Sequence, residues 1–319
     1  MKRQWTIGRK ITGGYGLVLL ALAVIAVWSV YGIGGIVDNA GEVIDGNKLR
    51  GEMVQKEVDH LNWASQVTDL LTDANVTTLT VQTDPHKCAF GKWYYSEART
   101  HAEEVVPSIK EDLAAIEQWH NDLHASAIEI GEKFTQADLN LSALLQQKKV
   151  DHLTWAHRVK DVFVDSSLTK AEVQENPQKC GFGKWLHSEA VAQLCAEDAA
   201  FARLYAKVQE PHGKLHASAQ HINALLAEGE RDEAAAYYLA NTKPLAYETC
   251  GVIDEMIAWN DTQVDGMQQA QAVFATKTKP CLEKVQHYLT NIRQDVVDNV
   301  MTDEQMLQAA SRTRLGVIV

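Results

Sequence analysis

The sequence reads KCAFGKW at residues 87–93 and, with a single change, KCGFGKW at residues 179–185. Each copy follows a His-x-x-Trp motif and precedes a His-x-x-x-His motif. Matching positions lie 92 residues apart, and further identities at this offset join residues 59–130 to 151–222 without a gap. Identity this dense at one fixed offset indicates an internal duplication. The paired motif residues are His60/His152, Trp63/Trp155, Cys88/Cys180, His120/His212 and His124/His216.

Composition predicts an all-α fold for the 319 residues. Proline is scarce, with six residues, and the β-branched runs are short, whereas Ala, Leu, Glu and Gln are abundant. Apolar residues also recur at helical spacing, as in Val54, Val58 and Leu61. With 46% hydrophobic residues, the chain can bury a sizeable core.

Three histidines and one cysteine in each copy form a set suited to tetrahedral zinc. The spacing supports this, because a His-x-x-x-His motif places both rings on one face of a helix. The alternative interpretation is that these histidines are ordinary helix residues and that the cysteines are small hydrophobic residues of the core. Whether a site draws all four ligands from one copy or borrows one from its neighbour stays open. The sequence predicts two zinc sites, with ligands His60, Cys88, His120 and His124, and His152, Cys180, His212 and His216.

Residues around the predicted ligands have expected roles of their own. Phe90, Trp93 and Trp63 should pack over the site, and Gly91 should permit a close backbone approach or a tight turn. A cysteine near the start of a helix should have a lowered pKa. Lys92 is either solvated or near the thiolate, and Asp59 is either a hydrogen-bond partner behind the ligands or a surface charge. The same holds for the second copy. Six other histidines should be surface or satisfied core residues.

A membrane-spanning helix is predicted at residues 11–37, which carry no charge and are rich in Leu, Val, Ala and Ile. Lys2, Arg3, Arg9 and Lys10 precede it, and acidic residues follow, so we expect a cytoplasmic N-terminus. A cleaved signal peptide is the alternative, although the apolar run is longer than usual for one. The remaining chain should then be extracytoplasmic, and periplasmic in a Gram-negative host.

Residues further along the chain predict a succession of helices. One long helix is expected from Pro107 to Leu145, continuing into the His152 segment, because no glycine or proline lies between Glu132 and Leu168. Pro211 should start the helix of the second His-x-x-x-His motif, and Pro244 should separate two helices. The predicted divisions are a cytoplasmic N-terminus (1–10), a transmembrane helix (11–37), a first zinc-binding module (38–150), a second (151–260), a helix returning to the membrane (261–314) and the start of a second transmembrane helix (315–319).

Several functions find no support in the sequence. The formal charge of −12 argues against a nucleic-acid partner. Five cysteines are too few for a disulfide scaffold, and at most one pair among Cys195, Cys250 and Cys281 could form a bond. Motifs for c-type haem attachment, for hydrolases and for nucleotide binding do not occur. We therefore expect a protein that is not an enzyme.

The order of motifs resembles the chemoreceptor zinc-binding domain, called CZB, of bacterial chemotaxis receptors and some diguanylate cyclases. The resemblance covers about 59–130 and 151–250 and implies zinc at the eight residues named above. The wider layout is similar to a methyl-accepting chemotaxis protein. It implies a homodimer in the inner membrane that signals through a cytoplasmic part outside this chain. The family often carries this domain in the cytoplasm, whereas the charges here predict the opposite side.

These observations favour the sensory portion of a transmembrane chemotaxis receptor that passes a signal by helix displacement. The stimulus could be zinc, an oxidant attacking the thiolate or a small ligand bound elsewhere on the bundle. A membrane-anchored extracytoplasmic protein that buffers zinc without signalling is the alternative. A third possibility is that zinc is purely structural.

Overall fold

The computed structural model describes residues 6–318, with side chains up to Arg314, so that Lys2, Arg3 and Val319 lie outside the described residues. Every regular element between residues 6 and 318 is a helix, which confirms the predicted all-α class. The chain forms two compact units: unit 1 comprises Met1–Glu132 and Ala270–Val319, and unit 2 comprises Lys133–Gln269. Unit 2 is thus inserted in the sequence of unit 1. The units divide the chain at 132/133 and 269/270, whereas the sequence placed divisions at 150/151 and 260/261.

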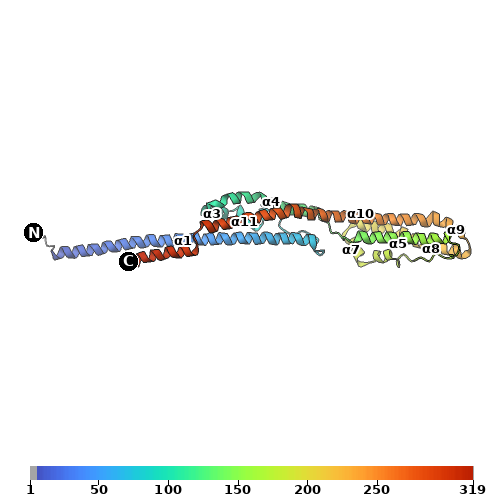
Figure 1. Ribbon diagram of the computed structural model, residues 1–319, viewed down its shortest axis with the longest axis horizontal. Helices are drawn as coiled ribbons and strands as arrows, with labels where there is room; N and C mark the ends of the chain where they lie inside the picture. Colours follow the sequence, from blue (N-terminus) through green and yellow to red (C-terminus); the bar gives the residue numbers. More distant parts are fainter. Residues whose placement is uncertain (1–5, 319) are drawn as a thin grey trace. The chain divides into compact units, whose positions relative to one another are not determined.

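Unit 1 is built on its first helix, α1, which packs along α11 and α12 (Figure 1). Buried residues of α1, α4 and α11 form much of its core, among them Met53, Val67, Leu113, Ile116 and Leu289. The elements of this unit are α1 (Ile7–Thr72), α2 (Ala89–Tyr94), α3 (Glu97–Val105), the 3₁₀-helix η1 (Pro107–Ile109), α4 (Lys110–Lys133), the π-helix η3 (Phe274–Thr278), α11 (Lys279–Asn299) and α12 (Asp303–Ile318).

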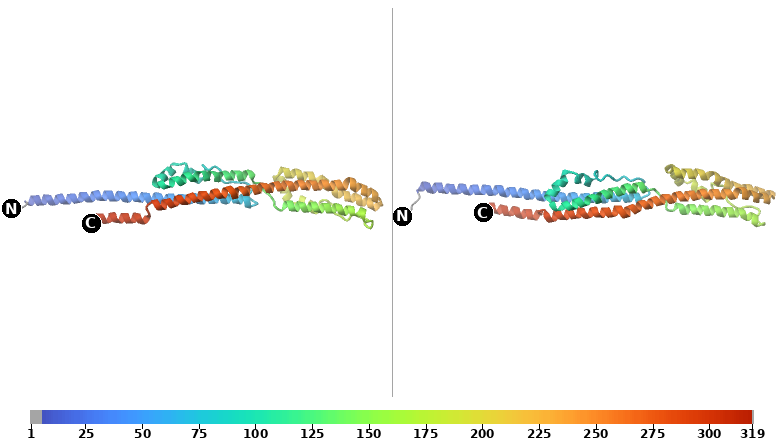
Figure 2. Two further views of the ribbon diagram at one scale, coloured as in Figure 1. Left: turned by 45° about the horizontal axis from the view of Figure 1, so that its top comes forward. Right: turned by 90° about the horizontal axis from the view of Figure 1, so that it is seen from above.

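Unit 2 is again a bundle of helices (Figure 2), in which α5 is shorter than its counterpart α1 and α8 is longer than its counterpart α4. One part of its core surrounds Trp155, Leu215 and Tyr238, and another surrounds Phe182 and Phe201. Its elements are α5 (Leu141–Val164), α6 (Gly181–Leu186), α7 (Glu189–Glu197), α8 (Ala199–Glu228), α9 (Arg231–Tyr237), the π-helix η2 (Tyr238–Thr242) and α10 (Lys243–Val273), whose last residues belong to unit 1.

The predicted membrane segment forms the first part of α1. Among the described residues, α1 is the one helix long and apolar enough to cross a membrane, and its apolar window is not buried. The helix continues without interruption from this segment to Thr72. Helix α12 runs beside it, since a Cβ atom added at Gly32 would collide with the Thr313 side chain, and the Asn47 amide donates to Asp303 Oδ1 over 3.2 Å.

The long helix predicted from Pro107 through Leu145 ends at Lys133, so that prediction is wrong. Residues 134–140 are not helical because polar side chains there form hydrogen bonds outside the helix. Thr135 Oγ1 donates to the Gln263 carbonyl over 2.7 Å, and Asp138 Oδ1 accepts the Asn140 N–H over 2.8 Å. Short polar side chains that bond to nearby backbone compete with helix formation even without glycine or proline.

Two proline predictions are also wrong. Helix α8 begins at Ala199, where Asp198 Oδ1 accepts the Phe201 N–H, and Pro211 lies within this helix instead of starting it. Pro244 lies in the first turn of α10, which follows η2 directly, so it does not separate two helices. Capping at Asp198 sets the start of α8 twelve residues before the proline.

Each unit has a closing helix that begins with a π-helix and a Thr-Lys-Pro sequence. These sequences start at Thr242 in unit 2 and at Thr278 in unit 1, 36 residues apart. A proline ring clashes with the carbonyl four residues before it, and in both units that carbonyl lies in the π-helix, where the wider turn can move it aside. Thr242 Oγ1 bonds to Ser218 Oγ over 2.9 Å, and Thr278 Oγ1 to Ser126 Oγ over 2.8 Å. The closing helix of unit 1 therefore follows unit 2 in the sequence.

Candidate metal centres

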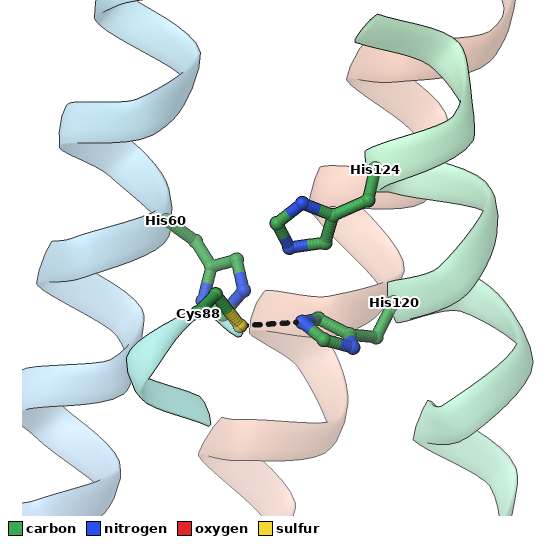
Figure 3. A group of neighbouring side chains, drawn as sticks. All are labelled: His60, Cys88, His120 and His124. Atoms are coloured by element: carbon green, nitrogen blue, oxygen red, sulfur yellow. Dashed lines mark hydrogen bonds between the residues drawn. The ribbon is translucent and has the colours of Figure 1, made fainter. Parts of the chain in front are cut away.

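The structure brings each predicted ligand set together. His60 lies on α1, Cys88 directly precedes α2, and His120 and His124 lie on α4, all pointing toward one centre (Figure 3). Their ligand atoms all lie within 4.8 Å of one another. The ligand atoms of the second group lie equally close together: His152 lies on α5, Cys180 directly precedes α6, and His212 and His216 lie on α8. Each group draws all four residues from one copy of the repeat.

Backbone carbonyls orient the imidazole rings. In unit 1, His60 Nδ1 contacts the Lys56 carbonyl over 2.7 Å, and His124 Nδ1 contacts the Gln82 carbonyl over 2.9 Å. In unit 2, His152 and His216 make the same contacts to Lys148 and Gln174, over 2.7 Å and 2.6 Å. A carbonyl can only accept, so Nδ1 carries the proton and Nε2 presents its lone pair to the centre. Metal-bound histidines are held in this way.

The inward-facing nitrogens fit a metal ion. Nε2 of His60, His124, His152 and His216 is buried without a hydrogen-bond partner. Buried polar atoms are rarely left unpaired, and a cation would satisfy all of these lone pairs. Cys88 Sγ lies 3.2 Å from His120 Nε2, and Cys180 Sγ lies 3.3 Å from His212 Nε2. Tetrahedral zinc, with bonds of about 2.0–2.3 Å, separates neighbouring ligand atoms by about 3.3–3.7 Å.

Burial keeps the histidines neutral, which is the form that binds metal. Removal from water lowers the pKa of His120 to about 2 and of His212 to about 3, with the neighbouring rings adding to the effect. The same cause lowers the pKa of both His124 and His216 to about 4. It also lowers the pKa of His60 and His152. The rings therefore need not lose a proton when a metal enters at neutral pH.

The thiols behave differently from the prediction. Cys88 and Cys180 sit at the start of α2 and α6, and each Sγ accepts the N–H of the residue three positions on, Gly91 or Gly183, over 3.1 Å. Burial nevertheless raises the pKa of both thiols, and it outweighs these backbone contacts. The predicted lowering is thus wrong for the metal-free chain. Metal binding must itself displace the thiol proton.

Glycine in the repeated stretch is required by a close backbone approach. A Cβ atom at Gly91 would collide with the Pro85 carbonyl oxygen, and one at Gly183 with that of Pro177. The same two oxygens lie 3.4 Å and 3.2 Å from Cys88 Sγ and Cys180 Sγ. Of the two roles predicted for this glycine, the structure confirms the close backbone approach. The contact fixes the loop that carries the cysteine.

Two of the three predicted aromatic rings, Phe90 and Trp63, cover the centre, whereas Trp93 packs against Phe90, with 6.1 Å between the ring centroids. The Phe90 ring meets His120 edge-on at 4.7 Å between centroids, and the Trp63 ring lies 5.2 Å from His124. Trp63 Nε1 also donates to the Gln82 carbonyl over 2.8 Å, the same oxygen that orients His124. Trp155 and Gln174 repeat this arrangement in unit 2. One loop carbonyl thus positions both a ligand and its aromatic cover.

The charged residues Lys92, Lys184 and Asp59 are surface residues and do not contact the ligands, which was one of the two roles predicted for each. Lys92 and Lys184 are exposed, and the lysines whose charge favours the thiolates are Lys56 and Lys148. Asp59 accepts from Gln55 over 2.8 Å instead of from a ligand histidine, and so acts as a surface charge. Three pairs of residues near the sites were not predicted from the sequence to have a role there. All three are identities at the 92-residue offset, and this signal could have revealed them: Gln55/Gln147, Lys56/Lys148 and Gln82/Gln174.

The remaining histidines and cysteines lie outside these groups. His86, His101, His157, His187, His221 and His287 are all exposed, which confirms the surface role. All five cysteines, each among the described residues, are free thiols. The pair predicted as a conceivable disulfide is therefore not bonded.

Both repeats, at residues 60–130 and 152–223, were compared with known protein families. Each matches the chemoreceptor zinc-binding domain (CZB). This agrees with the predicted resemblance for the two repeats, and the two groups of three histidines and one cysteine fit two zinc sites. The matches end before the closing helices of both units. No curated protein and no solved structure matches the chain.

Proposed function

We propose that the chain is the sensory portion of a transmembrane chemotaxis receptor whose two CZB sites hold zinc. One observation carries this proposal: the zinc ligand His60 lies on α1, the same helix that begins with the apolar segment 11–37. A change at the first site therefore acts directly on a helix suited to cross a membrane.

The connection between the site and the apolar segment is short and continuous. From Val37 to His60 the chain advances 23 residues within α1, about 35 Å at 1.5 Å per residue. When bound, zinc joins the four ligands and thereby cross-links α1, the Cys88 loop and α4. Loss of that link leaves the Nε2 atoms of His60 and His124 buried without a partner. Relief of this cost favours a shift of α1 relative to α4, which is the proposed signal.

The proposal places the protein in the inner membrane with both units extracytoplasmic. Arg9 and Lys10 precede the apolar segment, and Asp38, Glu42 and Asp45 follow it, in support of this orientation. Helix α12, beside α1, supports a return to the membrane. We also propose a homodimer. An exposed apolar stripe on α1, formed by Ile44, Val54, Val58 and Leu61, supports this assembly, and the signal would pass to chemotaxis signalling proteins.

Catalysis is not part of the proposed function. Catalytic zinc sites keep one coordination position open for water or substrate, whereas structural sites use four protein ligands. Each group here supplies four side chains from within one unit. The ligand set therefore supports a site that senses or stabilises.

Fluorine NMR can test the proposed coupling on the full chain in lipid nanodiscs. Trp28 lies in the apolar segment of α1, and incorporated 5-fluorotryptophan reports on its surroundings; Trp28→Phe assigns the resonance. Chelation of zinc should shift the Trp28 resonance. Cys88→Ser combined with His124→Ala should abolish the shift, and the matched pair Cys180→Ser with His216→Ala should retain it, because no ligand of the second site lies on α1. A Trp28 resonance unaffected by chelation would contradict coupling and favour the buffering alternative.

A further inference from the structure

Unit 2 contains a pocket away from its zinc site, between α5 and the junction of η2 with α10. Its volume is about 310 Å³, at the lower end of the range typical of small-molecule sites. Leu153, Ala156, His157 and Lys160 line it from α5, at the spacing of one helical face. Tyr238, Leu239, Lys243, Ala246 and Tyr247 line it from the other side.

The pocket combines positive charge with apolar surface. Lys160 and Lys243 are exposed cations, and among the described residues no carboxylate forms an ion pair with either. Leu239 and Tyr247 are large side chains with more than half of their surface exposed, 62% and 63%. In a chain of formal charge −12, these two lysines form a locally positive surface beside exposed apolar side chains.

The duplication provides an internal comparison. The α1 residues 92 positions before His157 and Lys160 are Ser65 and Thr68, which carry no charge. In the closing helix of unit 1, Ala275 and Glu283 stand 36 positions after Leu239 and Tyr247. Lys243 keeps a counterpart in Lys279, and Leu153 and Ala156 keep theirs in Leu61 and Ala64. Unit 1 therefore lacks the second lysine of this surface and has a glutamate in place of Tyr247.

The pocket adjoins an element that reaches toward the second zinc site. Its wall includes Tyr238 and Leu239 of the π-helix η2, and π-turns in helices are frequent at functional sites. The last residue of η2, Thr242, bonds to Ser218, which lies two residues after the zinc ligand His216. Tyr238 itself donates its hydroxyl proton to the Ala156 carbonyl over 3.3 Å, so its ring forms a fixed floor.

We infer that this pocket binds a small aromatic carboxylate. The ammonium groups of Lys160 and Lys243 bind the carboxylate, and Leu153, Leu239 and Tyr247 cover the ring. Charge-assisted hydrogen bonds to the carboxylate provide the preference for an anion, and the apolar side chains provide the preference for an aromatic body. The inference concerns binding alone and holds whether or not the chain signals.

Benzoate is the probe, and benzamide is its neutral counterpart of the same shape. Both are titrated by ligand-observed NMR against the zinc-loaded full chain in nanodiscs, with empty nanodiscs as the blank. Benzoate should bind with a dissociation constant of about 1 mM or below, and benzamide at least about tenfold more weakly. This comparison needs no variant. Failure of benzoate to saturate the protein below about 10 mM, or equal binding of both compounds, would overturn the inference.

Variants locate the site. Lys160→Met and Lys243→Met should each weaken benzoate binding at least about tenfold, because each removes one charged donor. Lys279→Met, at the corresponding position of unit 1, is the matched control and should leave benzoate binding unchanged. All three side chains are exposed, and each variant should retain two zinc ions as evidence of folding. Equal weakening by Lys279→Met and Lys243→Met would show that binding occurs elsewhere.

Discussion

Replacement of glycine by alanine should have different effects at two positions near the zinc ligands of unit 2. Gly183 lies three residues after Cys180 in the repeated stretch, and Gly213 directly follows His212 in α8. A Cβ atom at Gly213 meets nothing within 4 Å, whereas one at Gly183 collides with the Pro177 carbonyl oxygen and lies 2.8 Å from its carbon. The same substitution, Gly→Ala, should therefore have opposite effects at two positions of one site.

The magnitudes follow from helix propensity and packing. Alanine stabilises a helix by about 0.5–1 kcal/mol relative to glycine, so Gly213→Ala should stabilise unit 2 by this amount. Gly183→Ala has the same gain, but overpacking costs about 1–3 kcal/mol. The Pro177 carbonyl cannot move freely, because it belongs to the loop that holds Cys180. A clash with backbone places the cost toward the upper end, about 2–3 kcal/mol, so the net loss is about 1–2.5 kcal/mol. Because the clash displaces the loop that positions Cys180, this loss should appear as about 5- to 70-fold weaker zinc binding at the second site.

Zinc competition with a chromophoric chelator measures this difference on the purified chain. The first site provides an unaltered reference in each sample, since its ligands all lie in unit 1. Gly183→Ala should lower the binding affinity for one of the two zinc ions, and Gly213→Ala should lower the affinity for neither. Unchanged affinity in Gly183→Ala would refute the argument that the Pro177 contact fixes the cysteine loop.

Three further predictions concern stability and orientation. Thr242→Val should lower the free energy of unfolding by about 1 kcal/mol in urea, because it removes the buried bond to Ser218, whereas Thr276→Val on the exposed face of η3 should have a smaller effect. Without metal, the chain should lose stability in acid. The folded histidines have lowered pKa values, so below about pH 6.5 the unfolded chain binds more protons, and unfolding becomes easier by up to about 1.4 kcal/mol per pH unit for each buried ring. Equal unfolding free energies at about pH 7.5 and about pH 5.5 would contradict this. A membrane-impermeant amine reagent applied to intact cells, once the outer membrane is permeabilised, should label Lys92 and Lys184; protection of both would contradict the extracytoplasmic orientation.

The sequence was sufficient to find the ligand sets because helix geometry is local. His120 and His124 share a face through their spacing alone, and the duplication linked them to His60 and Cys88 at a constant offset. The carbonyls that orient the rings could not be assigned in this way. Backbone atoms of Gln82 and Gln174 act there, and any side chain leaves a carbonyl at the same place.

The arrangement of the chain was harder to predict for a different reason. The closing helices correspond at an offset of 36, not 92, because unit 2 is inserted before the last helices of unit 1. A comparison at one offset cannot detect an insertion of this kind. The break at residues 134–140 depends on the contact between Thr135 and Gln263, which are distant in sequence. Tertiary contacts here override the helical propensity of the segment.

The thiol pKa shows where a local rule fails. A helix start alone lowers the pKa of a cysteine, but burial among Phe90, the histidines and the loop raises it further than the backbone N–H of Gly91 lowers it. The depth of burial is a property of the folded unit. A sequence motif does not report it.

X-ray absorption at the zinc K-edge, on purified full chain with its zinc content determined, tests the central claim most directly. Two groups of three Nε2 atoms and one Sγ predict two zinc ions per chain, with an average first shell of three nitrogens at about 2.0–2.1 Å and one sulfur at about 2.3 Å. A first shell without sulfur, or a chain that retains no zinc after purification, would contradict the claim.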